Sequence, residues 1–299
     1  MLKTRFQKLA AVLTAAAALT GVCSLGASAE DIMTFRTAQV TERQYLKEAD
    51  FLNNGASLPF AVYVDNYSGL SRFKLTLDSD KPLTISNSGY SSPALFSKFA
   101  IGDGESGNTQ SAFYHEDAEG NPINVAVYFN DYDGILPYPN AEIANEGGSL
   151  LSFNVNIPKG IKAGVYQVGC KEGFLLNSVG QKEYYCYAFD RDSHSNYTIQ
   201  NAQIVIEPDN YLRGDVDFDG DVDDTDAVAV LRYLAGSILE LPQDMLDAEL
   251  GTPYIHGAKL AGDVDENGEL NEVDAAAILT YYAHEILMET PDWDEILGD

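Results

Sequence analysis

The chain has 299 residues, 46 of them acidic and 18 basic, which gives a formal net charge of −28 at pH 7. A surface this negative repels nucleic acid and anionic lipid, so partners of both kinds are excluded. The length predicts two domains after any targeting segment.

The N-terminus has the pattern of a secretory signal peptide. Three basic residues within the first eight precede the apolar run Leu9–Val22, and Ala27-Ser28-Ala29 forms a small-x-small cleavage site. The apolar run is too short and too rich in alanine to predict a membrane-spanning helix. We expect residues 1–29 to be removed, which takes three positive charges away and changes −28 to −31. The mature protein is then secreted and extracellular, and it reaches a cell surface only through its partners.

Residues 33–208 alternate apolar and polar side chains with the period of a β-strand. The clearest segments contain Phe60, Val62 and Val64; Phe73, Leu75 and Leu77; Val125, Val127 and Phe129; Leu151, Phe153, Val155 and Ile157; and Ala202, Ile204 and Ile206. Turn residues such as Pro158-Lys159-Gly160 separate them. Strands with one apolar face predict two antiparallel sheets packed as a β-sandwich.

The order of these segments resembles the cohesin family. The resemblance rests on Phe73–Asp78 followed by Pro82–Ile85, on Lys162–Tyr166, and on the closing strand Asn201–Ile206, while Gln44–Asn54 and Asp103–Asn108 look like insertions. It implies a jelly-roll sandwich that receives a dockerin, the partner module of cohesins, on one sheet. A related carbohydrate-binding sandwich is the alternative.

The resemblance also implies which strands form the receiving face. By order these are Arg72–Leu77, Ala112–Glu116, Asn124–Asp131 and Val165–Cys170. Alternation assigns Phe73, Leu75, Val125, Val127 and Phe129 to the core, and leaves Arg72, Lys74, Tyr114, Ala126, Tyr128 and Asn130 for the outer face. Tyr128 is the expected anchor, because a central tyrosine commonly dominates a protein interface.

Two cysteines, Cys170 and Cys186, remain after removal of the signal peptide. Both fall in strand-like segments of the sandwich. Export permits a disulfide, but two buried free thiols are equally compatible with the sequence.

The C-terminal part contains a duplicated acidic motif. Gly214–Asp226 recurs as Gly262–Asp274 with a constant offset of 48 residues. Calcium prefers six to eight oxygen ligands, and an EF-type loop supplies them from positions 1, 3, 5, 7, 9 and 12 with glycine at position 6. The predicted ligands of the first loop are Asp215, Asp217, Asp219, the carbonyl of Asp221, Asp223 and Asp226, with Gly220 at position 6. Those of the second loop are Asp263, Asp265, Asn267, the carbonyl of Glu269, Asn271 and Asp274, with Gly268 at position 6.

The segments around the loops differ from those of an ordinary EF-hand. Glycines and prolines before each loop predict that neither has an entering helix. The exiting helices are expected to bury Ala227, Val228, Leu231 and Leu234 in the first copy, with Gly236 as the stop, and Ala275, Ile278, Leu279, Tyr282 and Ile286 in the second. Val222 and Leu270 are expected to pack one loop against the other, and an extra helix is expected at Gln243–Leu250.

This combination of loops and helices resembles the dockerin family over residues 211–299. The resemblance covers the Gly-Asp-Val-Asp start of each loop and the helix endings Leu-Arg-Tyr-Leu and Leu-Thr-Tyr-Tyr. It implies two bound calcium ions and a partner cohesin. The implied contact residues are Asp224, Thr225 and Arg232 in the first copy, and Glu272, Val273 and Thr280 in the second.

Residues that carry catalysis show no catalytic arrangement in the sequence. His115, His194, His256 and His284 are scattered, and the chain has neither a Gly-x-Ser-x-Gly elbow nor a glycine-rich phosphate loop. Asp131, Asp133 and Glu142 would be the carboxylates of a glycosidase, but acids in the loops of a β-protein are usually solvated. We predict that the protein is not an enzyme.

The sequence therefore predicts a mainly β protein with a small α module. The expected parts are a signal peptide (1–29), a cohesin-like β-sandwich (33–208) and a calcium-binding dockerin-like module (209–299). The expected function is that of an adaptor scaffoldin in a cellulosome, an assembly for polysaccharide degradation. The dockerin would bind a scaffold cohesin, and the sandwich would receive another dockerin. The alternative is a carbohydrate-binding or structural protein carried by its dockerin.

Overall fold

A computed structural model describes the backbone of residues 32–41, 45–65, 72–90, 108–116, 122–130, 149–176, 178–190, 193–194 and 196–298. At residues 72–73, 87–90, 108–116, 122–130, 189–190 and 193–194 the side chains are not described. The predicted signal peptide lies outside the described residues, as do Asp131, Asp133 and Glu142.

The first sheet of the sandwich has five strands. Their order is β14 (Tyr197–Gln200), β1 (Met33–Gln39), β3 (Ala56–Asp65), β8 (Ser149–Ile157) and β5 (Thr84–Tyr90). All neighbours are antiparallel except β1 and β14, which are parallel. The sheet contains two of the predicted strands, at 60–64 and 151–157.

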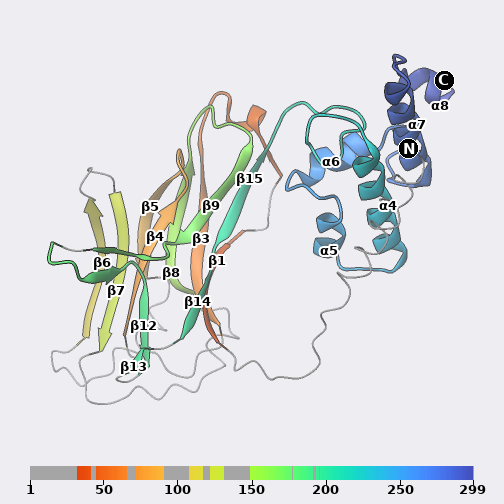
Figure 1. Ribbon diagram of the computed structural model, residues 1–299. Helices are drawn as coiled ribbons and strands as arrows, with labels where there is room; N and C mark the ends of the chain where they lie inside the picture. Colours follow the sequence, from red (N-terminus) through yellow and green to blue (C-terminus); the bar gives the residue numbers. More distant parts are fainter. Residues whose placement is uncertain are drawn as a thin grey trace.

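The second sheet lies against the first (Figure 1). Its order is β13 (Ser193–His194), β12 (Tyr187–Asp190), β4 (Arg72–Ser79), β9 (Gly164–Cys170), β15 (Ala202–Glu207) and β2 (Leu46–Lys47); β7 (Pro122–Asn130) pairs with β4, and β6 (Asn108–Glu116) with β7. β15 and β2 are parallel. The prediction of purely antiparallel sheets is thus wrong at two edge pairs, because alternation reports which face is buried and not the strand direction.

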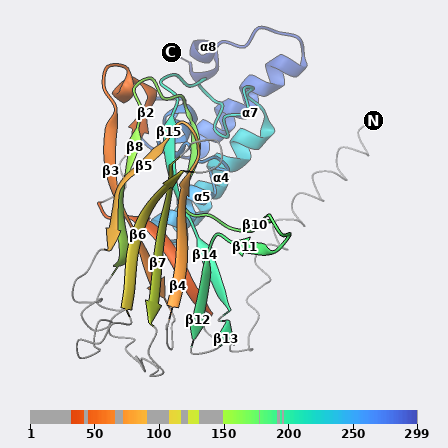
Figure 2. The same cartoon turned by 90° about the vertical axis from the view of Figure 1, so that its left-hand side faces the viewer.

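Between β9 and β12 the chain leaves the sheet as a hairpin of β10 (Phe174–Leu176) and β11 (Lys182–Tyr184), which stands away from the sandwich in Figure 2. A short 3-10 helix, η1 (Glu48–Phe51), follows β2 inside a segment predicted as an insertion.

The sandwich core contains the predicted apolar residues of β3, β8 and β15 and of the described part of β4. Phe60, Phe153, Leu75 and Ile206 are at most 2% exposed, and Val155 is completely buried. Thr76, which alternates with the core residues Leu75 and Leu77 along β4, is also buried. Its hydroxyl donates to the carbonyl of Tyr185 at 2.7 Å, because the chain returning from the hairpin covers this part of β4.

The helical module, residues 209–298, lies beside the end of the sandwich where β15 finishes (Figure 1). It contains α4 (Asp224–Ile238), α5 (Gln243–Ala248), α6 (Ile255–Gly262), α7 (Glu272–Ile286) and α8 (Trp293–Leu297). α4 packs on α7. α5 was predicted, and both predicted exiting helices are present with 15 residues each. Val222 and Leu270 contribute to one apolar cluster, as expected.

The prediction that neither loop has an entering helix is wrong for the second loop. α6 ends at Gly262, directly before Asp263. Its glycines permit close packing rather than breaking the helix. A Cβ atom on Gly257 would lie 2.6 Å from the Phe218 ring, and one on Gly262 would lie 2.8 Å from Leu270.

The predicted buried faces of the exiting helices are partly wrong. Ala227, Val230, Ala275 and Ile278 are buried, whereas Leu231, Leu279 and Ile286 are 42%, 43% and 52% exposed. Both helices carry apolar residues on two sides, and periodicity cannot decide which side faces the core.

Gly236 does not stop α4, which continues to Ile238. The chain turns at Glu240, a residue with φ of 54°, and Met288 has the same role after α7 with φ of 59°. Gly236 is instead buried against α5, since a Cβ atom there would lie 2.7 Å from Leu246. Among the described residues, no helix combines the length and the apolar character needed to cross a bilayer.

Candidate metal-binding loops and partner surfaces

The first loop brings three carboxylates together. Side-chain oxygens of Asp215, Asp217 and Asp219 all lie within 4.8 Å of one another. Asp215 Oδ2 accepts from the backbone N–H of Gly220 at 3.2 Å, while its buried Oδ1 has no hydrogen-bond partner among the described residues. Burial raises the pKa of Asp215, and its charged neighbours raise it further. A buried carboxylate oxygen that has no donor among the described residues, on a member of a carboxylate cluster, fits a bound cation.

The second loop repeats this arrangement with one different member. Side-chain oxygens of Asp263, Asp265 and Asp274 lie within 4.8 Å of one another. Asp263 Oδ2 accepts from the N–H of Gly268 at 2.8 Å, the same contact as in the first loop. The described donor set of both loops consists of oxygen atoms, which suits a hard cation such as calcium.

The backbone of the two loops is also repeated. Gly220 and Gly268 have φ of 103° and 90°, as position 6 requires. Position 4 is left-handed as well, with φ of 63° at Phe218 and 57° at Glu266. Neither residue type favours this conformation, so the sequence gives no signal for it.

Asp226 and Asp274, at position 12, hold each loop closed. Asp226 accepts from the N–H groups of Val216 at 2.6 Å and Asp223 at 2.8 Å, which lie at opposite ends of the loop. Asp274 accepts in the same way from Val264 and Asn271. Burial raises the pKa of Asp226 to about 6 and also raises that of Asp274. Asp226 is not among the three clustered carboxylates of its loop, whereas Asp274 is.

The remaining predicted ligands lie around these clusters. Asp223 and Asn271 act as N-caps, because their Oδ1 atoms accept from the N–H groups of Thr225 and Val273, each at 2.7 Å. The N–H of Asp221 donates to Asp219, and the Asn267 amide donates to Asp265. The carbonyl of Glu269 accepts from the Asn271 amide at 3.3 Å.

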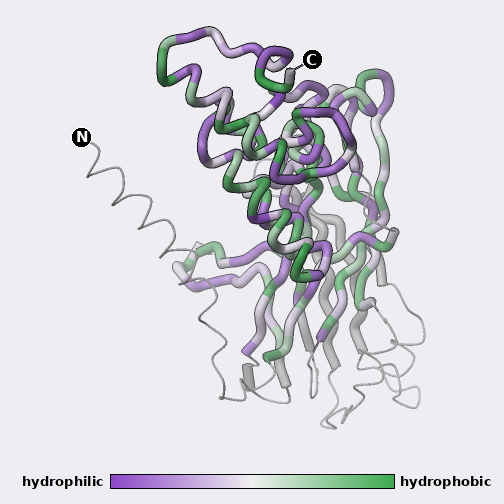
Figure 3. The backbone as a smooth tube through the Cα atoms, turned by 90° about the vertical axis from the view of Figure 1, so that its right-hand side faces the viewer, coloured by the Kyte–Doolittle hydropathy of each residue, from purple (hydrophilic) through white to green (hydrophobic). Residues whose placement is uncertain are grey.

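The contact residues predicted on the helices lie on one exposed face of each helix. Asp224, Thr225 and Arg232 are exposed on α4, and Glu272, Val273 and Thr280 are exposed on α7. The exposed apolar residues Leu231, Ile238 and Leu239 lie at intervals that share this face, and Leu279, Ile286 and Leu287 repeat them 48 residues later. Figure 3 shows the resulting mixture of apolar and polar residues along these helices. The prediction from the sequence did not include this apolar contribution, because it assigned Leu231 and Leu279 to the core.

The four strands predicted for the receiving face are consecutive neighbours in the second sheet. β6 pairs with β7, β7 with β4, and β4 with β9. The register pairs Lys74 with Val127 and Leu75 with Ala126. Directly opposed residues belong to the same face. Lys74, predicted on the outer face, therefore shares a face with Val127, predicted in the core. The faces predicted for β4 and for β7 thus disagree by one residue.

Among the side chains predicted for the receiving face, the structure describes Lys74 alone. Its ammonium group donates to the carbonyl of Tyr184 at 3.0 Å, so it contacts the hairpin. The side chains of Arg72, Tyr114, Ala126, Tyr128 and Asn130 lie outside the described residues.

A contact between the two ends of the helical module was not predicted. Trp293 in α8 stacks on Tyr281 with ring centres 4.4 Å apart, and the Arg213 guanidinium lies 5.5 Å from the Trp293 ring. A Cβ atom on Gly214 would lie 2.8 Å from Trp293. Arg213 also donates to the carbonyl of Val264 at 2.8 Å, which links the start of the first loop to the second.

These loops and helices can be compared with known families. Residues 213–281 match the dockerin type I domain. The dockerin match begins at Arg213 and includes both candidate calcium loops and most of α7. No match is found among curated proteins.

Solved structures similar to the chain include several cohesins. A type III cohesin module from the ScaE cell-surface anchoring scaffoldin of Ruminococcus flavefaciens has 12% identity and a TM-score of 0.38, over 59% of this chain and 88% of that one. A non-cellulosomal cohesin from Archaeoglobus fulgidus has 13% identity and a TM-score of 0.34, over 58% and 91%. The third ScaC cohesin of Acetivibrio cellulolyticus, in complex with the ScaB dockerin, has 14% identity and a TM-score of 0.34, over 59% and 99%.

Proposed function

We propose that the protein is a non-catalytic assembly protein of cellulosome type, an adaptor scaffoldin with one binding module at each end. The observation that carries this proposal is the dockerin type I match over residues 213–281, on a chain whose preceding part is a β-sandwich. The proposed parts are an exported leader (1–29), a cohesin-like sandwich (33–208) and a dockerin module (209–299). The protein would act outside the cell.

The dockerin module would hold two calcium ions, one in each loop. The fit rests on the two carboxylate clusters and on the buried Asp215 oxygen that has no hydrogen-bond partner in the part of the chain that the structure describes. Calcium would compensate the repulsion among these carboxylates, while Asp226 and Asp274 keep the ends of each loop together. The proposed ligands are Asp215, Asp217, Asp219, Asp221, Asp223 and Asp226 in the first loop, and Asp263, Asp265, Asn267, Glu269, Asn271 and Asp274 in the second.

The exposed face of the two helices would bind a cohesin. Its predicted contact residues are Asp224, Thr225 and Arg232 on α4, with Glu272, Val273 and Thr280 as their counterparts on α7. The copies differ in charge and polarity, and we therefore propose one dominant binding orientation. Arg232→Ala and Thr280→Ala form a matched pair: one change should weaken binding about tenfold or more, and the other should have little effect. Equal small effects, with binding lost only in the double variant, would contradict a single orientation.

The sandwich would receive the dockerin of another protein on the β6–β7–β4–β9 face. The predicted contact residues are Arg72 and Lys74 on β4, with Tyr114, Tyr128 and Asn130 on β6 and β7. The register pairs Phe73 with Tyr128 and Leu77 with Asn124, so the two groups lie on opposite faces of the sheet and only one of them can contact the dockerin. Support for this role comes from the adjacency of the four strands. The test is calorimetry of the full chain, in calcium, against a panel of dockerins and a panel of cohesins from one secretome.

Two outcomes of this experiment are decisive. Binding to a cohesin through the helical module and to a dockerin through the sandwich is the expected result. The Asp215→Ala and Asp263→Ala double variant, which serves as the control, should lose cohesin binding and keep dockerin binding. The alternative is tested by sedimenting the chain with insoluble polysaccharide. If no dockerin binds in calorimetry but the chain sediments with the polysaccharide, the adaptor proposal fails and a dockerin-borne carbohydrate-binding protein replaces it.

A further inference from the structure

Cys170 and Cys186 lie at the base of the β10–β11 hairpin. Cys170 ends β9, where it pairs with Leu77 of β4, and Cys186 directly precedes β12, where Tyr187 pairs with Lys74 of the same strand. β9 and β12 therefore follow one another along a single edge of β4, and residues 171–185 leave the sheet between them. Both cysteines are buried free thiols, and the Cys186 thiol donates to the carbonyl of Lys171, the residue after Cys170, at 3.2 Å.

We propose that Cys170 and Cys186 form a disulfide that closes the base of this hairpin. The proposal rests on the proposed export, because disulfides form in oxidising compartments. Backbone contacts already hold the two cysteines in place: the N–H of Lys171 donates to the carbonyl of Thr76 at 2.8 Å, and that of Tyr185 donates to the carbonyl of Gly173 at 3.1 Å.

The chemistry is thiol–disulfide exchange with a small or protein disulfide. The hydrogen bond from Cys170 lowers the pKa of Cys186, while the same bond and burial raise the pKa of Cys170. The Cys186 thiolate attacks the oxidant and releases one thiolate. Cys170 then loses its proton, attacks the sulfur of Cys186 and releases the second thiolate. Two protein thiols become one disulfide, and the oxidant is reduced to two thiols.

The bridge would constrain a hairpin that exposes large apolar side chains. Phe174, Leu176 and Val179 are 42%, 62% and 74% exposed. A cross-link around this segment removes freedom from the unfolded chain. It also keeps the apolar hairpin at one position along β4.

The test is peptide mapping of the full chain after refolding in a glutathione redox buffer, with free thiols blocked by iodoacetamide. We expect a cross-linked peptide pair containing Cys170 and Cys186, and a melting temperature that dithiothreitol lowers by about 5–10 °C. The Cys170→Ala and Cys186→Ala double variant should show no such shift. Full alkylation of both thiols after refolding in the oxidising buffer would overturn the proposal. This assay requires neither export nor partner binding, so it is independent of the proposed function.

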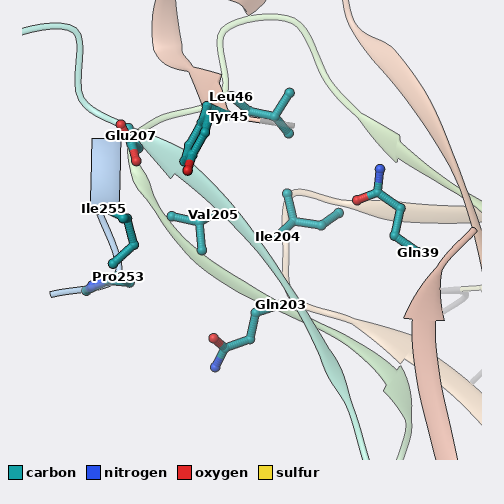
Figure 4. Close-up of a pocket in the computed structure, with 9 residues that line it drawn as sticks. All are labelled: Gln39, Tyr45, Leu46, Gln203, Ile204, Val205, Glu207, Pro253 and Ile255. Atoms are coloured by element: carbon teal, nitrogen blue, oxygen red, sulfur yellow. The ribbon is translucent and has the colours of Figure 1, made fainter. Parts of the chain in front are cut away.

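The sandwich contacts the helical module at Glu207. Glu207, the last residue of β15, is 3% exposed, and its carboxylate accepts from the N–H groups of His256 at 2.9 Å and Gly257 at 3.0 Å. These groups belong to the first turn of α6. Figure 4 shows Glu207 beside Ile255, next to a small pocket between β15 and α6. The Tyr45 and His256 rings, 5.3 Å apart, extend the contact.

α6 connects this contact to the second loop. The Glu207 carboxylate lies at the N-terminus of the helix, where it complements the helix dipole. The helix ends at Gly262, directly before Asp263. The carbonyl of Ala261 also accepts from the N–H of Gly214 at 2.8 Å, next to the first loop. We infer that the seating of the sandwich on α6 and calcium binding at the second loop stabilise each other, a coupling that rests on the proposed calcium sites.

Calcium titration of the full chain tests this coupling. Glu207→Ala should lower the affinity of one calcium site about fivefold or more and leave the other unchanged. Small-angle scattering should also show a larger radius of gyration for this variant. Glu183→Ala, at an exposed residue of β11, is the control and should change neither quantity. Affinities equal to those of the control would overturn the coupling while leaving calcium binding intact. A chain that binds no calcium would overturn the proposed sites as well.

Discussion

Replacing the first carboxylate of each loop by its amide should change the stability of the helical module in opposite directions with and without calcium. The variant carries Asp215→Asn and Asp263→Asn. An amide oxygen still accepts from Gly220 or Gly268, so the loop contact is retained while a negative charge is removed. At 4.8 Å, two carboxylates repel each other by about 3 kcal/mol at an effective dielectric constant near 20, and by about 1 kcal/mol in water.

Asp215 is buried, Asp217 is half-buried and Asp219 is exposed. The larger figure therefore applies to the Asp215–Asp217 pair and the smaller one to the Asp215–Asp219 pair, which gives up to about 4 kcal/mol of repulsion removed from the first loop. In calcium the change has the opposite sign once calcium stabilises the unaltered chain by more than the repulsion that the variant relieves. At a calcium concentration of about 10,000 times its Kd, a site contributes about 5.5 kcal/mol to stability, which exceeds the repulsion of about 4 kcal/mol.

Circular dichroism during heating, in calcium and in chelator, measures both effects. We expect the unaltered chain to lose its helical signal in chelator and to be the more stable form in calcium. The variant should keep a cooperative helical transition in chelator, where the unaltered chain has none, and should melt below the unaltered chain in calcium. A variant that is less stable in both conditions would refute the reasoning, because the carboxylates would then be structural acceptors rather than mutually repelling cation ligands.

Three further changes test the packing, each by thermal unfolding in calcium. Trp293→Ala removes the stack on Tyr281 and should destabilise the helical module by about 2 kcal/mol, while Trp293→Phe should retain most of the stability. Gly236→Ala places a methyl group against α5 and should cost about 1–3 kcal/mol. Gly169→Ala should destabilise the sandwich by a similar amount, because its Cβ would lie 2.1 Å from Asn201 Oδ1. A melting temperature within 2 °C of the unaltered chain would contradict the corresponding contact.

The loops were predictable because the chemistry of a calcium site fixes residue types at fixed spacing. The offset of 48 residues holds for more than the ligands, since both exiting helices begin and end in register and turn at Glu240 and Met288. These last two residues could not be predicted. Their left-handed conformation is imposed by the turn after each helix and not favoured by a glutamate or a methionine.

α6 was not predicted, because its glycines are helix breakers when only local preference is considered. In the folded chain Gly257 and Gly262 provide room for Phe218 and Leu270, and the N-terminus of the helix is satisfied by Glu207, about 50 residues earlier. Tertiary contacts therefore override the local preference. The receiving face shows the same limit, because alternation defines two faces for each strand but not the register that matches one strand to the next.

The two halves of the helical module share a backbone but not their surroundings. Gly236 packs against Leu246 of α5, whereas its counterpart His284 contacts Glu289, with 3.0 Å between Nδ1 of His284 and Oε2 of Glu289. On the exposed face the apolar pair Leu231 and Leu279 is conserved between the copies, so either half offers a partner the same central contact. The neighbours of that contact decide between them, because a half-turn of the module would exchange the charge of Arg232 for the hydroxyl of Thr280. A cohesin that presents a carboxylate at this position would therefore select the α4 half, and one that presents an apolar or cationic group would select the α7 half.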